Sequence, residues 1–258
     1  MKMTQNTILI TGGGSGIGRG LAEAFHALGN QVVIAGRSQQ TLDAATDANP
    51  GMKSLTLDIA DAGSIRAFAA RVTEDFPELN VLINMAGVMK NENLLDPSET
   101  LSDSEATIAT NLLGPIRLTT ALTPALLKQP HAAIMNVSSG LAFVPLALTP
   151  TYCATKAAIH SYTESLRYQL KETSVQVLEL IPPYVQTELQ GARQANDPMA
   201  MPLAEYIAET IQILTTSPDA TEICVERVRT LRGAASSGGY DAFFKTFNDA
   251  MVAARSSH

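Results

Sequence analysis

The sequence predicts an α/β protein in which one parallel sheet is covered by helices on both faces, and three observations predict it. Short apolar runs rich in Val and Ile recur along the chain, segments of helical period separate them, and a Gly-rich turn joins the first run to the first helix. Because the runs are nearly continuous in apolar residues rather than alternating, we expect strands buried on both faces. The predicted strands are Thr7–Thr11, Gln31–Ala35, Ser54–Leu57, Val81–Asn84, Ala132–Val137 and Val175–Ile181.

The segments between these runs predict the helices. Two of them carry a clear apolar stripe, and a side chain able to cap a helix N-terminus, Asp61 or Ser64, precedes the second. Strand, helix and strand repeated in this order indicate a parallel sheet. Since no internal repeat and no linker interrupt the order, we expect residues 1–258 to form a single domain. The stripes consist of Leu21, Ala24, Phe25 and Leu28 and of Ile65, Phe68, Ala69 and Val72.

The pattern loosens after Thr187. Residues 188–202 are polar with small side chains, and we expect them to form a mobile lid over a substrate site, as loops of this length often do. Residues 203–258 form a variable C-terminal region. In it we expect a helix over Leu203–Leu214, a last strand over Glu222–Glu226, a loop over Arg232–Gly239 and an apolar-faced segment with Phe243, Phe244 and Phe247.

Composition and charge exclude several classes of protein. The chain has 258 residues, 45% of them hydrophobic, which is enough to bury a core and excludes intrinsic disorder. A net charge of -7 works against binding along a nucleic-acid backbone, which requires clustered Lys and Arg. We therefore expect no nucleic-acid partner.

The amino terminus and the cysteines bear on the compartment. Residues 1–6 are polar and lack the apolar core of a signal peptide. Only Cys153 and Cys224 are present, too few for a disulfide framework. Residues 129–155 carry no Asp, Glu, Lys or Arg, but three prolines would break a membrane-spanning helix there. We expect a cytoplasmic protein without a membrane span.

A Gly-rich turn follows the first predicted strand, in the order Thr11-Gly12-Gly13-Gly14-Ser15-Gly16-Ile17-Gly18. Glycine lets the backbone turn tightly and lets a phosphate approach the main chain, where free N–H groups and the helix dipole favour an anion. The segment lacks the Lys of a triphosphate-binding P-loop, so we expect a dinucleotide. A tight strand-to-helix turn without a ligand is the structural alternative. The candidate cofactor-binding residues are Gly12, Gly14, Ser15, Gly16, Ile17 and Gly18.

The residues after the second strand bear on the choice of cofactor. NAD would need an acidic side chain there for the ribose 2′-hydroxyl, but the sequence is Gly36-Arg37-Ser38. The planar guanidinium of Arg37 suits a 2′-phosphate, and Ser38 is a candidate for a further hydrogen bond. We expect NADP(H), with NAD as the other candidate. The alternative for Arg37 is an ordinary surface residue that opens a helix.

Tyr152 and Lys156 form a second constellation, with Ser139 thirteen residues before Tyr152. The two are four residues apart in a helical stretch, which places both on one face. A phenol ionises near pKa 10 in isolation, and a nearby ammonium together with a cationic nicotinamide would lower that pKa. Taken alone, such a pair is often a half-buried aromatic residue and a solvated base. Together with the Gly-rich turn and Asn84-Met85-Ala86-Gly87, it indicates a reaction site.

These motifs together resemble the short-chain dehydrogenase/reductase family over roughly residues 5–190, and a bacterial DltE-like subgroup of it over 136–145 and 152–170. The resemblance implies a Rossmann-type doubly wound fold, pyrophosphate binding at the Gly-rich turn, and Asn111, Ser139, Tyr152 and Lys156 as catalytic residues. In that family Tyr152 and Lys156 would also contact the cofactor. The further cofactor-binding residues that the resemblance implies are Asp58, Ile59, Asn84, Ala86, Gly87, Pro182, Val185 and Thr187.

The chain departs from the family pattern at two positions. Met85 stands where the family usually has a second Asn, and Pro183 stands where it usually has Gly. Because proline fixes φ and has no N–H, the backbone beside the nicotinamide is expected to differ there.

The resemblance implies reversible hydride transfer between NADP(H) and a carbonyl or secondary alcohol of a small molecule. In the reduction, Ser139 would hold the substrate oxygen, Tyr152 would protonate it, and Lys156 would hold the nicotinamide ribose. Asn111 would organise a helix kink and a proton relay. Two alternatives stay open, an NAD-dependent alcohol dehydrogenase of the same fold and a non-catalytic dinucleotide-binding sensor or scaffold.

The resemblance also bears on partners, because members of this family usually form homodimers or homotetramers. We expect a homo-oligomer for this reason alone. The four histidines show no metal-ligand spacing, so we expect no metal site.

Overall fold

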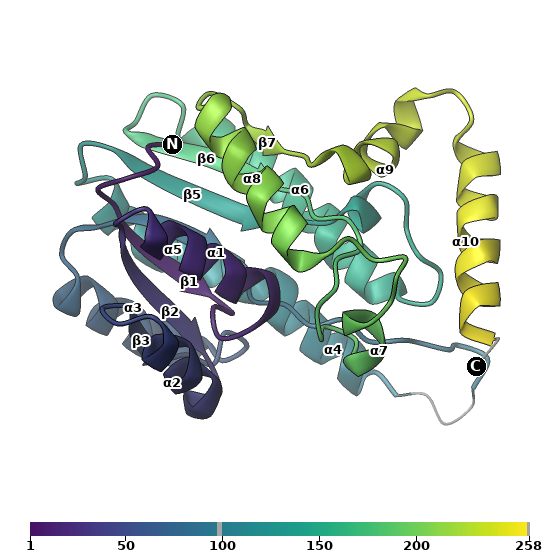
Figure 1. The fold of residues 1–258 in the computed structure, drawn as a ribbon, viewed down its shortest axis with the longest axis horizontal. Helices are drawn as coiled ribbons and strands as arrows, with labels where there is room; N and C mark the ends of the chain where they lie inside the picture. The colour runs from purple at the N-terminus through teal and green to yellow at the C-terminus, as the bar shows by residue number, and fades with distance from the viewer. Residues whose placement is uncertain (97–99, 257–258) are drawn as a thin grey trace.

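The sheet has seven strands, all parallel, in the order β3-β2-β1-β4-β5-β6-β7 (Figure 1). The structure is a computed structural model that describes residues 1–96 and 100–256. Strand order reverses between β1 and β4, which is the point where open parallel sheets bind ligands beyond their carboxyl ends. The Rossmann-type doubly wound sheet is thereby confirmed. Its strands are β1 (Thr7–Thr11), β2 (Gln31–Gly36), β3 (Lys53–Thr56), β4 (Leu79–Asn84), β5 (Ala132–Val137), β6 (Val175–Leu180) and β7 (Glu222–Ile223).

All six strands predicted before residue 185 are present. Two have the predicted bounds, and the others differ by one or two residues at one or both ends. The last strand is shorter than expected, because β7 pairs with β6 only at Glu222 and Ile223 and the chain then turns away. The prediction of a strand as far as Glu226 was wrong.

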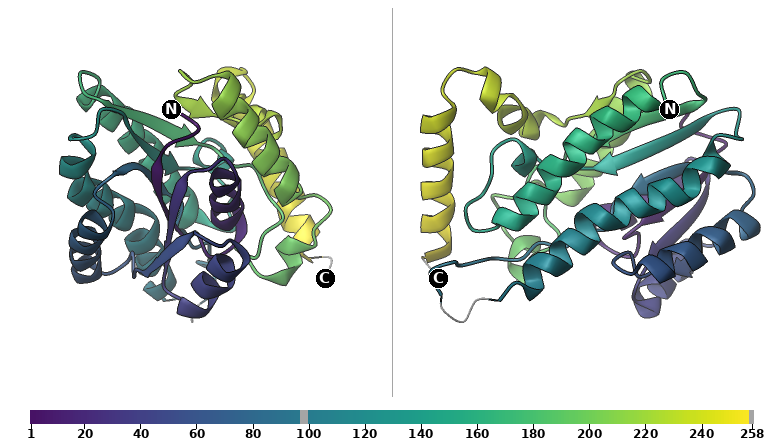
Figure 2. Two further views of the ribbon diagram at one scale, coloured as in Figure 1. Left: turned by 60° about the vertical axis from the view of Figure 1, so that its left-hand side comes forward. Right: turned by 180° about the vertical axis from the view of Figure 1, so that it is seen from behind.

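Six helices cover the two faces of the sheet (Figures 1 and 2). One face packs against α1 (Gly16–Ala27), α2 (Gln39–Ala48) and α8 (Leu203–Thr216). The other face packs against α3 (Ala62–Asp75), α5 (Gly114–Leu126) and α6 (Pro150–Gln169). The central strands therefore have no face open to solvent.

The side chains of β1 show why the strands are continuous in apolar residues. Successive residues of a strand point to opposite faces. Ile8 and Ile10 join the core beneath α1, whereas Leu9 joins the core beneath α3 and α5. Each is completely buried, so every position along the strand favours an apolar residue.

The helix stripes are confirmed for α3 and partly wrong for α1. Ile65, Phe68, Ala69 and Val72 are buried, and the N–H of Ser64 donates to Asp61 Oδ1 at 2.5 Å, so Asp61 is the cap. In α1 the buried face continues through Ala22 rather than Ala24. Leu28 lies beyond the last turn of α1 and is 39% exposed.

Past Thr187 the described part of the chain forms four α-helices, α7 to α10, and several short turns. Helix α7 (Ala192–Ala195) lies inside the expected lid, and α9 (Arg229–Gly233) includes the beginning of the segment expected to be a loop. That expectation was wrong at Arg232 and Gly233, and a 3-10 turn follows at Ala234–Ser236. Helix α10 (Tyr240–Ser256) stands apart from the sheet at one end of the molecule (Figures 1 and 2).

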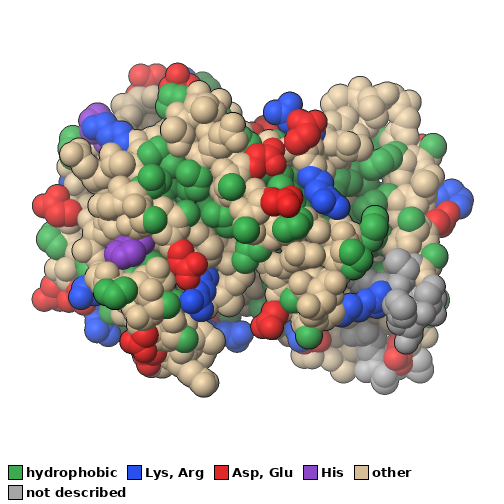
Figure 3. All heavy atoms as spheres, viewed as in Figure 1, with side chains coloured by type: hydrophobic (Ala, Val, Ile, Leu, Met, Phe, Trp, Pro, Cys, Tyr) green, Lys and Arg blue, Asp and Glu red, His purple; other side chains and the backbone are tan. Residues whose placement is uncertain are grey.

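The surface carries charges of both signs. Figure 3 shows basic and acidic side chains interspersed over this face rather than gathered by sign. Within residues 1–96 and 100–256, the helices are too short or too polar for any of them to span a bilayer.

Candidate active site

A cavity of about 760 Å³ opens at the carboxyl ends of β1, β4, β5 and β6, where the strand order reverses. Its size falls within the range of small-molecule and cofactor sites. It brings together segments that follow these four strands, with Arg37 added from the end of β2. Of the residues expected to act, those lining it are Gly12, Ser15, Gly16, Ile17, Gly18, Arg37, Ala86, Gly87, Ser139, Tyr152, Lys156, Pro182, Val185 and Thr187.

The Gly-rich turn has the shape of an anion cradle. Gly12 adopts φ +68, and a Cβ on Gly18 would lie 2.3 Å from the Gly12 carbonyl oxygen, so only glycine fits there. Ser15 caps α1, but its side chain accepts no capping hydrogen bond from the described residues. The first N–H groups of α1 therefore remain available to a ligand phosphate, and the turn fits a dinucleotide pyrophosphate.

Two expected residues of this region lie outside the cavity. Gly14 faces α2, because a Cβ on it would lie 2.9 Å from Thr41 Oγ1. Ser38 caps α2, since its hydroxyl accepts from the N–H of Thr41 at 3.3 Å. Arg37, in contrast, is exposed and lines the cavity at the end of β2.

Asp58 and Ile59 also lie outside the cavity lining. The N–H of Ala60 donates to Asp58 Oδ1 at 3.0 Å, so this carboxylate stabilises the turn after β3. Ile59 is buried, and its carbonyl oxygen would be 2.5 Å from a Cβ on Gly114. Asp58 remains exposed and free to contact a ligand as well.

Asn84 holds the sheet rather than lining the cavity. Its amide nitrogen donates to Asn136 Oδ1 at 2.8 Å and to Thr119 Oγ1 at 2.9 Å. These bonds tie β4 to β5 and to α5. The side chain of Asn136 extends this series of hydrogen bonds to α6 by donating to Thr163 Oγ1 at 3.0 Å. Asn84 thus fixes the strand end from which Ala86 and Gly87 enter the cavity.

Asn111 lies in a π-helical turn, η1 (Ala109–Leu113), between α4 (Ser102–Ile108) and α5. Its side chain pairs with the backbone of Val88, accepting from the N–H and donating to the carbonyl, each at 2.8 Å. A Cβ on Gly87 would lie 3.4 Å from Asn111 Oδ1 and 3.9 Å from Lys156 Nζ. Asn111 and Lys156 therefore approach Gly87 together. A π turn of this kind is a frequent feature of functional sites.

Ser139, Tyr152 and Lys156 meet where β5 ends and α6 begins. Ser139 lies in extended backbone after β5, and its hydroxyl accepts from the N–H of Leu141 at 3.1 Å. Tyr152 and Lys156 lie in the first turns of α6, and the Lys156 ammonium is 5.6 Å from the centre of the Tyr152 ring. Lys156 Nζ donates to the carbonyl of Val137 at 2.8 Å.

Burial dominates the ionisation of both groups. It raises the pKa of Tyr152 to about 12, against a lowering by a hydrogen bond with the Ser139 side chain. It also lowers the pKa of Lys156 to about 8. The charge of Lys156 is not among the causes of this shift in the free protein. The lower phenol pKa expected with a cationic nicotinamide beside the ammonium stays a prediction. Both side chains are almost fully buried, and burial favours the neutral form of each.

The C-terminal region contributes to the surroundings of Tyr152, which sequence patterns did not reveal. Tyr152 belongs to an apolar cluster that includes Met89, Phe247 and Met251. Asn248 of α10 ties this helix to the loop before α6, because its side chain accepts from the N–H of Ala147 at 2.7 Å and donates to the Pro145 carbonyl at 3.1 Å. The partners lie about a hundred residues apart in the chain, so no local signal marks the contact.

Residues 188–191 line the cavity, and Gln194 anchors the segment they belong to. The Gln194 amide donates to the carbonyl of Val185 at 2.8 Å and to Thr187 Oγ1 at 3.1 Å. It was not among the expected residues. Its role depends on the fold of the whole loop and has no sequence signature.

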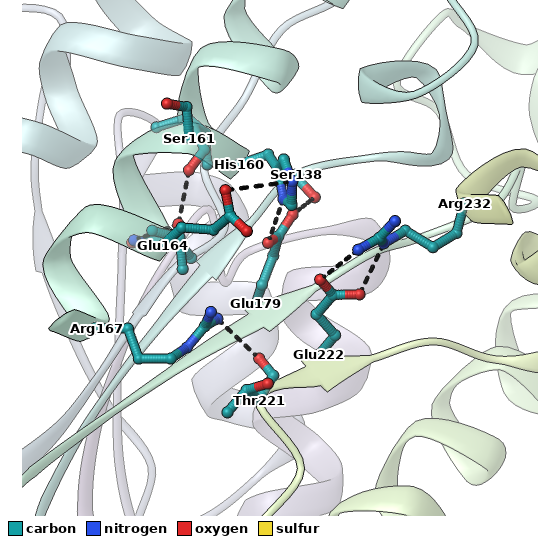
Figure 4. Close-up of polar contacts among 12 residues, drawn as sticks. Ser138, His160, Ser161, Glu164, Arg167, Glu179, Thr221, Glu222 and Arg232 are labelled. Carbon is teal, nitrogen blue, oxygen red and sulfur yellow. Dashed lines mark hydrogen bonds and ion pairs between the residues drawn. The ribbon is translucent and has the colours of Figure 1, made fainter. Parts of the chain in front are cut away.

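The structure also assembles a polar cluster that was not expected (Figure 4). Donor atoms of His160, Glu179 and Glu222 lie within 4.8 Å of one another, a spacing compatible with a metal ion. Each of these groups already has a protein partner, since Glu179 faces Ser138 and His160 while Arg232 binds Glu222. We therefore assign no metal to it.

The chain is similar to known proteins. A protein-family model for the short chain dehydrogenases matches residues 6–198. The chain is 41% identical over 251 residues to an uncharacterized oxidoreductase, DltE, of Bacillus subtilis, covering 96% of this chain and 98% of that protein.

Two solved structures are similar in fold. A short-chain dehydrogenase from Sphingobium yanoikuyae in complex with NADPH has a TM-score of 0.77 at 26% identity, covering 93% of this chain and 95% of that one. A short chain dehydrogenase/reductase from Burkholderia phymatum in complex with NAD has a TM-score of 0.79 at 21% identity, covering 92% and 95%.

Proposed function

The chain belongs to the short-chain dehydrogenase/reductase family, in its DltE-like subgroup, and on this premise we propose that it transfers a hydride between NADP(H) and a carbonyl or secondary alcohol of a small molecule. As a member of this family it is an NAD(P)-dependent oxidoreductase. One observation carries the finer proposal. A single cavity is lined both by the anion cradle of α1 with Arg37 and by Ser139, Tyr152 and Lys156.

Arg37 supports NADP(H) over NAD. It lines the cavity from the end of β2, where an NAD-binding protein of this fold carries an acidic side chain. Within the described residues it forms no ion pair, so its charge is free to meet a 2′-phosphate. An Asp or Glu at this position would repel that group.

The remaining contacts follow the order of the strands. We place the pyrophosphate at Gly12–Gly18, the adenine near Asp58 and Ile59, and the adenine ribose near Ala86 and Gly87. Asn84 would support the last two residues from behind. Gly14 and Ser38 would support the Gly-rich turn and α2. Pro182, Val185 and Thr187 would contact the nicotinamide side.

When bound, the nicotinamide ring supplies or accepts the hydride. The residues of this chain transfer the proton and stabilise the negative charge that develops on the substrate oxygen. Tyr152 holds its proton on Oη at neutral pH because of its raised pKa, which suits donation to a carbonyl oxygen during reduction. The Ser139 hydroxyl stabilises the negative charge that develops on the same oxygen.

Lys156 and Asn111 serve the same reaction from behind Gly87. Lys156 presents a buried amine to the cavity, where it would hold the nicotinamide ribose and favour the phenolate left on Tyr152. Asn111 lies against the same glycine and would relay protons toward Lys156. This arrangement supports an enzyme over a sensor, because a binding module has no need of four such groups.

Other parts of the proposal concern the molecule as a whole. Residues 188–202 would act as a lid, because they line the cavity and are anchored through Gln194. Residues 1–258 would form one catalytic domain whose C-terminal region lies beside Tyr152. Both cysteines are free thiols, which agrees with the cytoplasm. A homodimer or homotetramer is proposed from the family alone.

An activity screen tests the proposal. Purified protein would be offered NADPH with carbonyl compounds of varied size and charge, and NADP⁺ with the corresponding alcohols, while absorbance at the NADPH band is followed. We expect substrate-dependent oxidation of NADPH. Tight NADPH binding without turnover on any compound would favour a sensor, and turnover only with NADH would overturn the choice of cofactor.

A further inference from the structure

The cluster of Figure 4 surrounds a carboxylate that the sheet buries completely. Glu179 lies on β6, and its side chain has no exposed area. Moving an unpaired carboxylate out of water costs several kcal/mol, so such a group persists only where its neighbours compensate it. The neighbours of Glu179 therefore indicate what its charge does.

Each oxygen of Glu179 has a partner. The Ser138 hydroxyl donates to Oε1 at 2.5 Å, and His160 Nδ1 lies 2.8 Å from Oε2. On its other side, His160 Nε2 lies 3.8 Å from a carboxylate oxygen of Glu164, which is exposed. A chain of polar contacts thus leads from the cavity, which Ser138 lines, to the surface at Glu164.

The negative charge of Glu222, the adjacent acid on β7, is paired with a different residue. Glu222 is the register partner of Glu179, and Arg232 of α9 donates to it twice, at 2.7 and 2.8 Å. The guanidinium of Arg232 is therefore paired with Glu222, although the charge of Glu179 also acts on it. Cys224 also interacts with the charge of Glu179, and its pKa is raised, chiefly by burial.

Two basic side chains of α6 interact with Glu179, His160 by direct contact and Lys156 through its charge. Lys156 and His160 are four residues apart, so they lie on one face of that helix. Burial lowers the pKa of Lys156, and the charge of Glu179 acts in the opposite direction. Among the described residues, Glu179 is the charge that counters the effect of burial on this amine.

The backbone beside Glu179 leads to the same residues. Val137 accepts the hydrogen bond of Lys156, Ser138 donates to Glu179, and Ser139 is the third residue in the row. One short segment at the end of β5 therefore connects the lysine, the buried acid and the serine of the reaction site.

We propose that Glu179 is a positioning residue: through Ser138 it holds the segment Val137–Ser139, and its carboxylate is the buried anion that keeps Lys156 charged. The proposal rests on the proposed function only where it names Lys156 and Ser139 as groups of the reaction. The interaction between the charges of Glu179 and Lys156 is a property of the protein without cofactor.

The titration of Lys156 tests this directly. In protein labelled with [¹³C]lysine and free of cofactor, the Lys156 signal would be identified by its absence in Lys156→Met. In wild type we expect a midpoint near pH 8. In Glu179→Gln, which keeps the shape and removes the charge, the midpoint should fall by about one pH unit, a roughly tenfold change in acidity.

Glu164→Gln is the matched control. It makes the same substitution in a residue that contacts His160 but is 59% exposed, where solvent screens the charge. We expect it to leave the Lys156 midpoint unchanged. An unchanged midpoint in Glu179→Gln, or an equal shift in both variants, would overturn the proposal.

A double-mutant cycle keeps the proposal testable if Glu179→Gln folds poorly. The free energies of unfolding of Glu179→Gln, Lys156→Met and the double variant would be measured in urea. We expect the double variant to be more stable than the sum of the single losses, or to recover folding, because both buried charges are gone. Additive losses, or a double variant that stays unfolded, would overturn it. Neither experiment uses cofactor or substrate, so its outcome is separate from that of the activity screen.

Discussion

The ammonium of Lys156 lies 5.6 Å from the centre of the Tyr152 ring, one turn along α6, but donates its hydrogen bond to the carbonyl of Val137. Burial acts on both side chains in favour of their neutral forms. It raises the pKa of Tyr152 to about 12 and lowers that of Lys156 to about 8. At neutral pH the free protein thus holds a proton on Tyr152, as a carbonyl reductase requires of its acid.

The lowered pKa of Lys156 predicts how stability changes with pH. Folding favours the neutral amine, so burial of the charged amine lowers the free energy of unfolding. This penalty is present in full below pH 8 and disappears as pH rises to 10.5, the unperturbed pKa of the group. Lys156→Met removes the penalty. Its stability relative to wild type should therefore be greatest at pH 7 and decline by roughly 3 kcal/mol toward pH 10.5.

Urea unfolding of both proteins at pH 7, 9 and 10.5 measures this decline. Tyr152 also titrates above pH 10, but it is present in both proteins, so its contribution largely cancels in the difference. A stability difference that stays constant over this range would contradict the lowered pKa of the buried amine.

Arg37→Ala tests the choice of cofactor. The substitution removes the cation that faces the cavity at the end of β2, so NADPH affinity should fall by roughly 10-fold to 100-fold while NADH affinity stays the same. Fluorescence titration with each cofactor measures this. Arg66→Ala, at an exposed position of α3, is the control. An equal loss for both cofactors, or none, would count against a 2′-phosphate site.

Gly18→Ala tests the cradle. The new Cβ would lie 2.3 Å from the Gly12 carbonyl, and because that atom belongs to the backbone, the turn itself must shift. We expect a loss of about 1–3 kcal/mol in stability and at least tenfold weaker NADPH binding. Gly233→Ala, where a Cβ would meet nothing within 4 Å, should change neither. Undiminished NADPH affinity in Gly18→Ala would place the pyrophosphate elsewhere.

Features marked by local patterns could be predicted from the sequence. The strands were visible because both faces of each are buried, as Ile8, Leu9 and Ile10 show. The Gly-rich turn, Tyr152 and Lys156 were visible because their spacing within one element decides where they point. Errors in these elements fell mostly at their ends, as at Leu28, where the chain leaves the helix; Ala24, inside α1, is an exception.

Features that depend on distant contacts could not be predicted. Glu179 and Glu222 become neighbours through the register of β6 with β7, and Asn248 reaches Pro145 across most of the C-terminal half. The direction of the Tyr152 pKa also depended on burial by residues such as Phe247, which no spacing reveals.

Turnover of Tyr152→Phe tests the central claim most directly. With a carbonyl substrate identified by the screen, wild type, Tyr152→Phe and Tyr168→Phe would be compared for NADPH oxidation and NADPH affinity; Tyr168 lies on the same helix but is 71% exposed. We predict that Tyr152→Phe binds NADPH as wild type does and loses turnover by roughly 100-fold or more, while Tyr168→Phe keeps it. Turnover at the wild-type rate in Tyr152→Phe would contradict the account.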